Sequence, residues 1–157
     1  MIAAMSAPEP TARIVAFFET LTPATLATLG SHYSDDARFV DPFNDVKGQP
    51  AIRAVFEHMF ATLDAPRFEV VDAVTEGNQC FLVWNFHFRR HGHSADSLIH
   101  GASHLRFAAD GRVALHRDYW DAAQQVYENV PVLGAVMRWL RRRLFATGSS
   151  SSLKGAP

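Results

Sequence analysis

The stretch Tyr33-Ser-Asp-Asp-Ala-Arg-Phe-Val-Asp-Pro-Phe43 combines a polar turn, a short apolar strand and a carboxylate in front of a proline. Ser34-Asp35-Asp36 is typical of a turn, because such side chains hydrogen-bond to nearby backbone groups. Ala37–Asp41 has the composition of a strand, and Pro42 ends it because proline cannot donate to a β-ladder. The stretch therefore predicts a short early strand that ends at Asp41.

Helical patterns precede and follow this strand. Thr11–Leu21 places its apolar residues at helical spacing, which predicts an amphipathic helix. Thr22-Pro23 predicts an N-cap with proline at the first helical position, and so a second helix that continues to about Tyr33. A third helix is predicted after Gly48-Gln49-Pro50, with an apolar stripe that contains Phe56.

The hydrophobic period changes from helical to alternating after Pro66. Four strands are predicted in two hairpins, with turns at Gly77-Asn78 and Asp110-Gly111. They cover Arg67–Glu76, Gln79–Arg90, Leu98–Phe107 and Arg112–Asp121. In the second strand, alternation places one set of side chains on a single face: Cys80, Leu82, Trp84, Phe86 and Phe88.

Helices followed by antiparallel strands predict an α+β domain. We expect a curved antiparallel sheet wrapped around the N-terminal helices, a cone-shaped fold that encloses an apolar pocket. The chain of 157 residues has the length of one domain. We expect a flexible N-terminus over 1–10, a single domain over 11–145 that includes a C-terminal helical segment 122–145, and a flexible tail over 146–157.

Composition limits the classes of function. Hydrophobic residues make up 48% and charged residues 20%, which is typical of a globular domain. The formal net charge of −1 gives no overall field toward nucleic acid, and we expect no nucleic-acid partner. Cys80 is the single cysteine and cannot form an internal disulfide. Residues 1–10 lack the basic region of a signal peptide and no apolar stretch is long enough to span a bilayer, so we expect a cytoplasmic protein.

Four short motifs resemble the SnoaL-like and ketosteroid isomerase-like branch of the nuclear-transport-factor-2 superfamily. They are Asp35-Asp-Ala-x-x-x-Asp41-Pro42, Gly48-x-x-x-Ile52-Arg53, Ser103-His-Leu-Arg-Phe107 with Asp110-Gly-Arg-Val113, and His116-Arg-Asp-Tyr-Trp-Asp121. The resemblance runs from about Thr11 to Asp121 and implies the cone-shaped fold. It also implies acid/base chemistry without a cofactor, although one fold carries many functions.

Asp41 is the first candidate for a catalytic carboxylate. In ketosteroid isomerase, which is a standard example of such chemistry, the matching Asp-Pro aspartate moves a proton next to a carbonyl. A carboxylate that faces an aromatic cavity can serve as such a base. The alternative is that Asp41 caps the turn Asp41-Pro42-Phe43-Asn44 through its side chain.

The residues that would form the oxyanion hole of ketosteroid isomerase are not the expected ones. The position of the first-helix tyrosine falls at Ile14, and that of the later aspartic acid falls at Ser103. Isoleucine donates no hydrogen bond, and losing one donor costs about 10²- to 10³-fold in rate. We therefore do not expect steroid isomerisation.

Asp118 and His116 are the second pair of candidates. Strand alternation turns both inward if Trp120 faces the pocket. The resemblance to SnoaL-like cyclases implies an acid/base aspartate at Asp118, partnered by a histidine on the preceding strand, where His100 and His104 are available. Alternation places Ser103 and His104 on opposite faces, and we expect Ser103 inward and His104 outward. The alternative for Asp118 is a surface ion pair with Arg117 or Arg112.

The predicted ligand is a hydrophobic small molecule. Besides the carboxylates, we expect it to contact Phe17, Phe56, Trp84, Phe86, Ser103 and Trp120, although aromatic residues in such a pattern can equally be plain core. The leading hypothesis is a small-molecule enzyme with isomerase, cyclase or lyase chemistry on a carbonyl compound. The rival is a non-catalytic ligand-binding or dimeric scaffold protein of the same fold.

Other features give weaker expectations. The eight histidines show no metal-binding spacing, and we expect neither a metal site nor a cofactor. The open sheet face with Phe81, Val83 and His87 is the expected surface of a homodimer. Val130–Phe145 forms a basic amphipathic pattern, for which docking on the protein is favoured over contact with an anionic membrane.

Overall fold

The computed structural model describes residues 9–122, 136 and 139. The predicted helical segment 122–145 lies outside the described residues apart from residues 122, 136 and 139, and the predicted tail 146–157 lies wholly outside them. None of the described helices is long and apolar enough to cross a membrane.

The helical elements are shorter than predicted around the second helix. They are α1 (Glu9–Glu19), a 3₁₀ turn η1 (Thr25–Thr28), α2 (Leu29–His32) and α3 (Gln49–Thr62). The expected continuous second helix from Thr22 to Tyr33 is wrong. The Thr22 and Thr25 hydroxyls do accept each other's backbone N–H groups, as a cap would, but Tyr33 already belongs to a strand.

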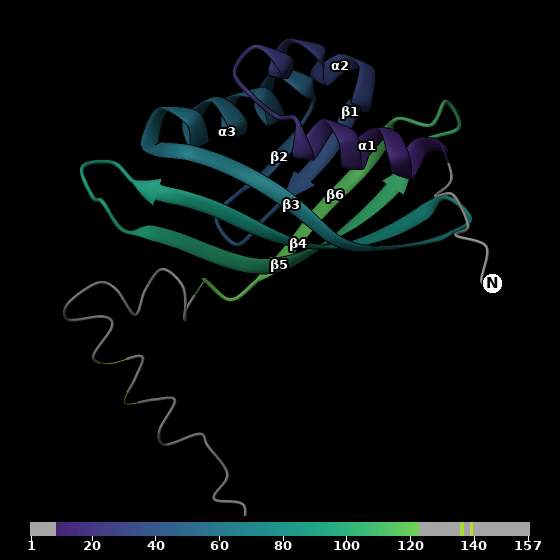
Figure 1. Ribbon diagram of the computed structural model, residues 1–157. Coiled ribbons are helices and arrows are strands. Elements are labelled where there is room, and N and C mark those ends of the chain that lie inside the picture. The colour runs from purple at the N-terminus through teal and green to yellow at the C-terminus, as the bar shows by residue number, and fades with distance from the viewer. Residues whose placement is uncertain (1–8, 123–135, 137–138, 140–157) are drawn as a thin grey trace, which may run out of the picture. The chain divides into compact units, whose positions relative to one another are not determined.

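Six strands form one curved sheet that does not close on itself (Figure 1). They are β1 (Tyr33–Val40), β2 (Asp45–Lys47), β3 (Leu63–Glu76), β4 (Gln79–Arg90), β5 (Asp96–Phe107) and β6 (Val113–Trp120), in the order β2-β1-β6-β5-β4-β3. The sheet is antiparallel except that β1 runs parallel to β6, which corrects the all-antiparallel expectation. The predicted turn at Ser34–Asp36 lies inside β1, at a register shift between Tyr33 and Arg38.

The two predicted hairpin turns are confirmed. Gly77 has φ +58° between β3 and β4, and Gly111 has φ +79° between β5 and β6. Glycine is favoured at both positions because this left-handed backbone conformation is strained for residues with a Cβ atom.

The helices cover one face of the sheet, and the core lies between the two layers (Figure 1). The predicted alternation in β4 is confirmed, since Cys80, Leu82, Trp84 and Phe86 are buried. On the opposite face Phe81 is 51% exposed. Several other large apolar side chains are exposed on the strands: Val71, Val74, Leu98 and Tyr119. Phe81 lies on the surface expected to carry a homodimer contact, and the homodimer itself stays a prediction.

The α+β arrangement, with helices over a curved sheet, matches the fold predicted from the sequence. The helices bury an apolar stripe, which in α1 consists of Ile14, Phe17 and Phe18 with Thr11. This stripe faces the buried side of β3 and β4, and the candidate site lies where it ends.

Candidate functional site

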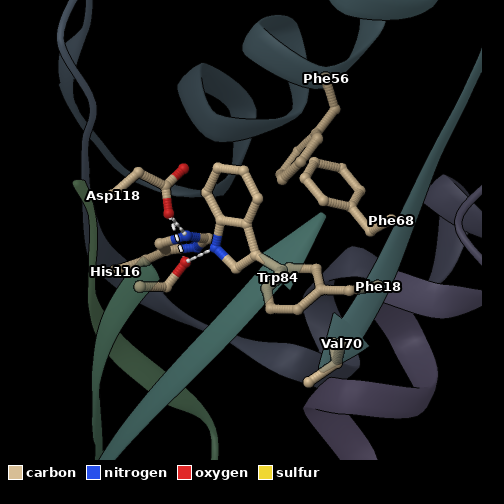
Figure 2. Close-up of a pocket in the computed structure, with 8 residues that line it drawn as sticks. Phe18, Phe56, Phe68, Val70, Trp84, His116 and Asp118 are labelled. Carbon is tan, nitrogen blue, oxygen red and sulfur yellow. Dashed lines mark hydrogen bonds and ion pairs between the residues drawn. The ribbon is translucent and has the colours of Figure 1, made fainter. Parts of the chain in front are cut away.

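A cavity opens between α1, α3 and the buried face of the sheet (Figure 2). The cavity is narrow and partly open to solvent. Four elements supply its apolar side: Phe18 comes from α1, Phe56 from α3, Phe68 and Val70 from β3, and Trp84 from β4. The polar side consists of Ser103 from β5 with His116 and Asp118 from β6.

The apolar side is made of aromatic rings at fixed angles to one another. The Phe68 ring meets the Trp84 ring edge to face, with centroids 5.7 Å apart and an interplanar angle of 86°. Phe18 lies 6.1 Å from Phe68 between ring centroids. These separations fall in the range in which aromatic pairs attract each other, so the rings hold one another in place.

The polar side is a continuous chain of hydrogen bonds. Trp84 Nε1 donates to Ser103 Oγ at 2.8 Å, and Ser103 Oγ donates to Asp118 Oδ1 at 2.5 Å. His116 Nε2 lies 2.7 Å from the same carboxylate oxygen, and His116 Nδ1 lies 2.7 Å from the Tyr33 hydroxyl. Strand geometry explains the cluster: Ser103 faces Asp118 in the β5–β6 register, and His116 and Asp118 are two residues apart on one face.

The direction of the hydrogen bonds in this series depends on the two residues at its ends, Trp84 and Tyr33. The Trp84 N–H can only donate, so the Ser103 hydroxyl proton is free to go to Asp118. At the other end, the buried Tyr33 hydroxyl has a single side-chain partner among the described residues, His116 Nδ1. A Tyr33 hydroxyl that donates to Nδ1 leaves the Nε2–H of His116 directed at Asp118 Oδ1.

Burial makes this arrangement rigid. Tyr33 is fully buried, and Ser103 and His116 are each 3% exposed. Burial, and then the negative charge of Asp118, raise the pKa of the Tyr33 hydroxyl well above its usual range. Tyr33 thus keeps its proton and stays a donor to His116 throughout the neutral range.

Asp118 is the member of the chain that meets the cavity with a free oxygen. Its side chain is 15% exposed, and both hydrogen bonds reach Oδ1. Within the part of the chain that the structure describes, no hydrogen bond or ion pair reaches Oδ2. Figure 2 shows one carboxylate oxygen of Asp118 pointing away from His116. That oxygen is available to a ligand.

The sequence model of the protein family described as the SnoaL-like domain matches residues 14–116, which is more than half of the 157 residues. The chain belongs to the SnoaL-like family. No curated protein matches it.

Solved structures share the fold of this SnoaL-like chain at low identity. A protein of Shewanella putrefaciens, assigned as a SnoaL-like polyketide cyclase, is 22% identical with a TM-score of 0.65, over 76% of this chain and 94% of its own. A Catenulispora acidiphila protein with a ketosteroid isomerase-like fold, in complex with trimethylamine, is 17% identical with a TM-score of 0.65. The match covers 77% of this chain and 92% of that protein. An NTF2-like protein of unknown function from Burkholderia pseudomallei is 14% identical with a TM-score of 0.67. The match covers 74% of this chain and 94% of that protein.

The SnoaL-like chain brings together five of the residues singled out from its sequence. Asp118, His116, Ser103, Trp84 and Phe56 all line the cavity. The inward position of Ser103 is confirmed, and His104 lies on the other face, where it stacks on Phe81 with ring centroids 4.6 Å apart. The histidine that contacts Asp118 is His116 on β6 itself.

Three aromatic residues expected in the ligand wall lie outside it. Phe17 is one position before Phe18 on α1, and its ring stacks on His32 instead. Phe86 lies behind Phe68, with ring centroids 4.5 Å apart. Trp120 is at the end of β6 and packs edge to face against Phe43. Phe17 and Phe86 pack against the wall residues Phe18 and Phe68.

Asp41 lies in a turn and is not among the residues that line the cavity. Strand β1 ends at Val40, so Asp41 follows the strand and does not sit on its inner face. Its Oδ1 accepts hydrogen bonds from the backbone N–H groups of Phe43 at 2.7 Å and Asn44 at 2.6 Å, and both carboxylate oxygens are 3.0 Å from Asn44 Nδ2. This is the geometry that the turn interpretation predicts.

Sequence reasoning missed four residues of the site: Tyr33, Phe18, Phe68 and Val70. Phe18 belongs to the apolar stripe of the first predicted helix, and only its neighbour was selected. Phe68 and Val70 alternate with the exposed Arg67 and Glu69 along β3, which is the signal that would have placed them inward. Tyr33 gave no signal, because the pattern placed it at the end of a helix.

Metal chemistry has no ligand set in the described part of this SnoaL-like chain. Across residues 9–122, 136 and 139, no three His, Cys, Asp or Glu side chains are grouped closely enough to hold an ion.

Proposed function

We propose that the chain is an acid/base enzyme that works without a cofactor, with Asp118 as its base. The single observation that supports this most is the free oxygen of a mostly buried carboxylate at the wall of an aromatic cavity. The other oxygen is held by Ser103 and His116. A base that is oriented in this way needs little reorganisation when it accepts a proton.

The proposed substrate is a hydrophobic carbonyl compound, and the reaction is of the isomerase, cyclase or lyase type. Asp118 Oδ2 would accept a proton from the carbon next to the carbonyl, and the electron pair of the broken C–H bond would move toward the carbonyl oxygen. The resulting carboxylic acid returns its proton to another atom of the same molecule. Membership of the SnoaL-like family supports this type of chemistry.

The role of Asp41 is proposed to be structural. Its carboxylate accepts hydrogen bonds within its own turn and is absent from the cavity wall. In this proposal Asp118 takes the part of the base that the family resemblance suggested for Asp41.

The proposal is tested by proton exchange, which needs no knowledge of the product. Ketones and lactones of increasing size, including ketones that carry an amine because the Catenulispora neighbour holds trimethylamine, are incubated with the protein in D₂O. Loss of the signal from the hydrogens next to the carbonyl is followed by ¹H NMR. We expect exchange with the wild type and a loss of about 10²-fold or more with Asp118→Asn, the usual contribution of a general base.

Asp41→Asn is the matched control, because it changes a carboxylate outside the cavity. Exchange should persist in this variant. If Asp118→Asn retained full exchange while Asp41→Asn lost it, Asp118 would not be the base.

A non-catalytic binding protein is the second candidate function. The observation that favours it is that the hydrogen-bond donors of the cavity wall are already used. Trp84, Ser103 and His116 all direct their protons along the chain toward Asp118. No donor of this chain of hydrogen bonds is therefore left to stabilise a negatively charged carbonyl oxygen. Binding of panel compounds without any exchange would support this function.

A further inference from the structure

The cavity combines aromatic walls with one carboxylate, and the balance of charge on its wall decides what it can hold. Phe18, Phe56, Phe68 and Trp84 line the apolar side. Asp118 is the single acidic residue in the lining, and the lining contains no lysine or arginine. Figure 2 shows Trp84 between Asp118 on one side and Phe56 and Phe68 on the other.

The cavity wall offers Asp118 no lysine or arginine as a partner. His116 forms the one ion-pair contact of Asp118 among the described residues, at 2.7 Å. That contact and the Ser103 hydrogen bond both reach Oδ1. The Oδ2 side of the carboxylate therefore has no positively charged partner within the described residues.

A carboxylate at an apolar cavity is costly to desolvate unless a positive charge accompanies it. Aromatic faces attract cations, and alkylated ammonium groups are well suited to aromatic sites because their alkyl groups also fit an apolar surface. The cavity satisfies both requirements of such a group, since it offers several ring surfaces and one free carboxylate oxygen.

We propose that the ligand of this cavity carries a tertiary or quaternary alkylammonium group, held by the aromatic rings with Asp118 as its counter-ion. The proposal rests on the proposed function, because it uses the same site and the same carboxylate. It adds the class of substrate: a small carbonyl compound with a cationic nitrogen close to the reacting carbon.

This substrate class also supplies what the cavity wall lacks. The donors of the wall are all used in the chain that ends at Asp118, so none is available to the carbonyl oxygen as it becomes negative. A positive charge on the substrate itself stabilises the negative charge that forms beside it. The absence of oxyanion donors at Ile14 and Ser103 is then no obstacle to the reaction.

The test compares two compounds of the same shape that differ in charge. Choline and its uncharged carbon analogue 3,3-dimethylbutan-1-ol are titrated into the full-length protein, and their affinities are measured by calorimetry. We expect choline to bind at least about tenfold more tightly, as cation–π attraction and a counter-ion together require. In Asp118→Asn the preference for choline should fall toward unity, while the affinity of the alcohol changes little.

Two further variants separate the contribution of the aromatic rings to choline binding from that of the carboxylate. Phe68→Leu removes an aromatic face and keeps an apolar side chain, so it should weaken choline and leave the alcohol unchanged even if Asp118→Asn fails to fold. Asp41→Asn removes a carboxylate outside the cavity and should leave both affinities unchanged.

Three results would overturn the proposal. They are equal affinities of the two compounds, no binding of either compound at millimolar concentration, and a choline preference that survives in folded Asp118→Asn. None of these results bears on the base itself. The exchange experiment, run with neutral and amine-bearing ketones and with Asp118→Asn, decides that question separately.

Discussion

Tyr33 and His116 lie 83 positions apart in the chain, yet their rings stack at 11° with centroids 6.0 Å apart and share a hydrogen bond of 2.7 Å. The first residue of β1 thereby contacts Nδ1 of a β6 histidine whose Nε2 faces Asp118. Through that histidine it positions one of the two groups that hold Asp118 Oδ1.

Replacing Tyr33 by phenylalanine should release the tautomer of His116. The ring packing stays, but His116 Nδ1 becomes a buried acceptor without a donor, and the free energy of unfolding should fall by about 1–3 kcal/mol. The tautomer is read from ¹⁵N NMR of labelled histidine: we expect the wild type to show Nε2–H alone and Tyr33→Phe to show a mixture. Tyr119→Phe, at a position that is 55% exposed, is the control and should change neither quantity. An unchanged tautomer in Tyr33→Phe would mean that Tyr33 does not set it.

Adding one methyl group at Gly101 should displace the Trp84 indole. A Cβ atom at this position would lie 2.4 Å from the nearest ring carbon of Trp84, which is closer than van der Waals contact allows. Gly101→Ala should therefore lower the free energy of unfolding by about 1–3 kcal/mol and change the tryptophan fluorescence, because the Trp84–Ser103 hydrogen bond is lost.

A double-mutant cycle tests whether this cost arises at the ring itself. Trp84→Phe replaces the indole by a smaller ring, so Gly101→Ala should cost less in that background. Equal costs in both backgrounds would show that the methyl group acts elsewhere. Ala102→Ser, one position along the strand on the other face, is the control substitution.

Removing the carboxylate of Asp41 should destabilise the turn after β1. Asp41→Ala loses the acceptor of two backbone N–H groups, and a hydrogen bond to a charged group contributes about 1.5–3 kcal/mol. We expect a loss of about 1–3 kcal/mol in chemical denaturation, because Asp41 is partly exposed and water replaces some of the hydrogen bonding. Asp96→Ala is the comparison, since that side chain is 92% exposed and its contact with Arg89 is 3.9 Å long. Equal stability of the two variants would contradict the structural role of Asp41.

His32 should make the protein less stable on mild acidification. Its Nδ1 is buried without a hydrogen-bond partner in the described chain, and burial, followed by the charge of Arg13, lowers the pKa of this imidazole below its ordinary value. The unfolded chain then binds a proton at a higher pH than the folded one does. The stabilising effect is fully present above the unfolded pKa of about 6.5 and is lost as the pH falls below that value toward the folded pKa.

His32→Phe tests this titration and keeps the stacking on Phe17, whose ring centroid is 4.3 Å from that of His32. Thermal unfolding between pH 5 and 8 should show a smaller loss of stability at acidic pH in the variant. His104 has a lowered pKa as well, from burial and then the charges of Arg106 and Arg117, so His104→Asn is measured in parallel. Identical pH profiles for wild type and His32→Phe would remove His32 as a contributor.

The β4–β6 part of the site could be predicted from the sequence because strands repeat every two residues. Once β5 is a strand, Ser103 and His104 must face opposite sides, and the same logic turns His116 and Asp118 inward together. Phe56 and Trp84 followed from the periods of their own elements. These positions depend on local pattern alone.

The rest of the site depends on contacts that no local pattern contains. The threonines at 22 and 25 do make a helix start, but the chain leaves the helix after His32 because Tyr33 pairs with Val113 in β6. That pairing is parallel and long-range, and it moves Tyr33 from a helix end to the centre of the site. For Asp41 the sequence allowed a base or a turn residue, and the hydrogen bonds within the turn together with the cavity lining favour the turn residue.

The parallel pairing of β1 with β6 has a consequence for the order in which the domain can assemble. These are the first and last strands of the described sheet, and they bring Tyr33, His116 and Asp118 together. During synthesis the helices and the two early strands emerge before the residue that Tyr33 must meet. A chain that ended before Val113 would hold the aromatic rings and no acid/base group beside them, so the polar half of the cavity forms only as the sheet is completed.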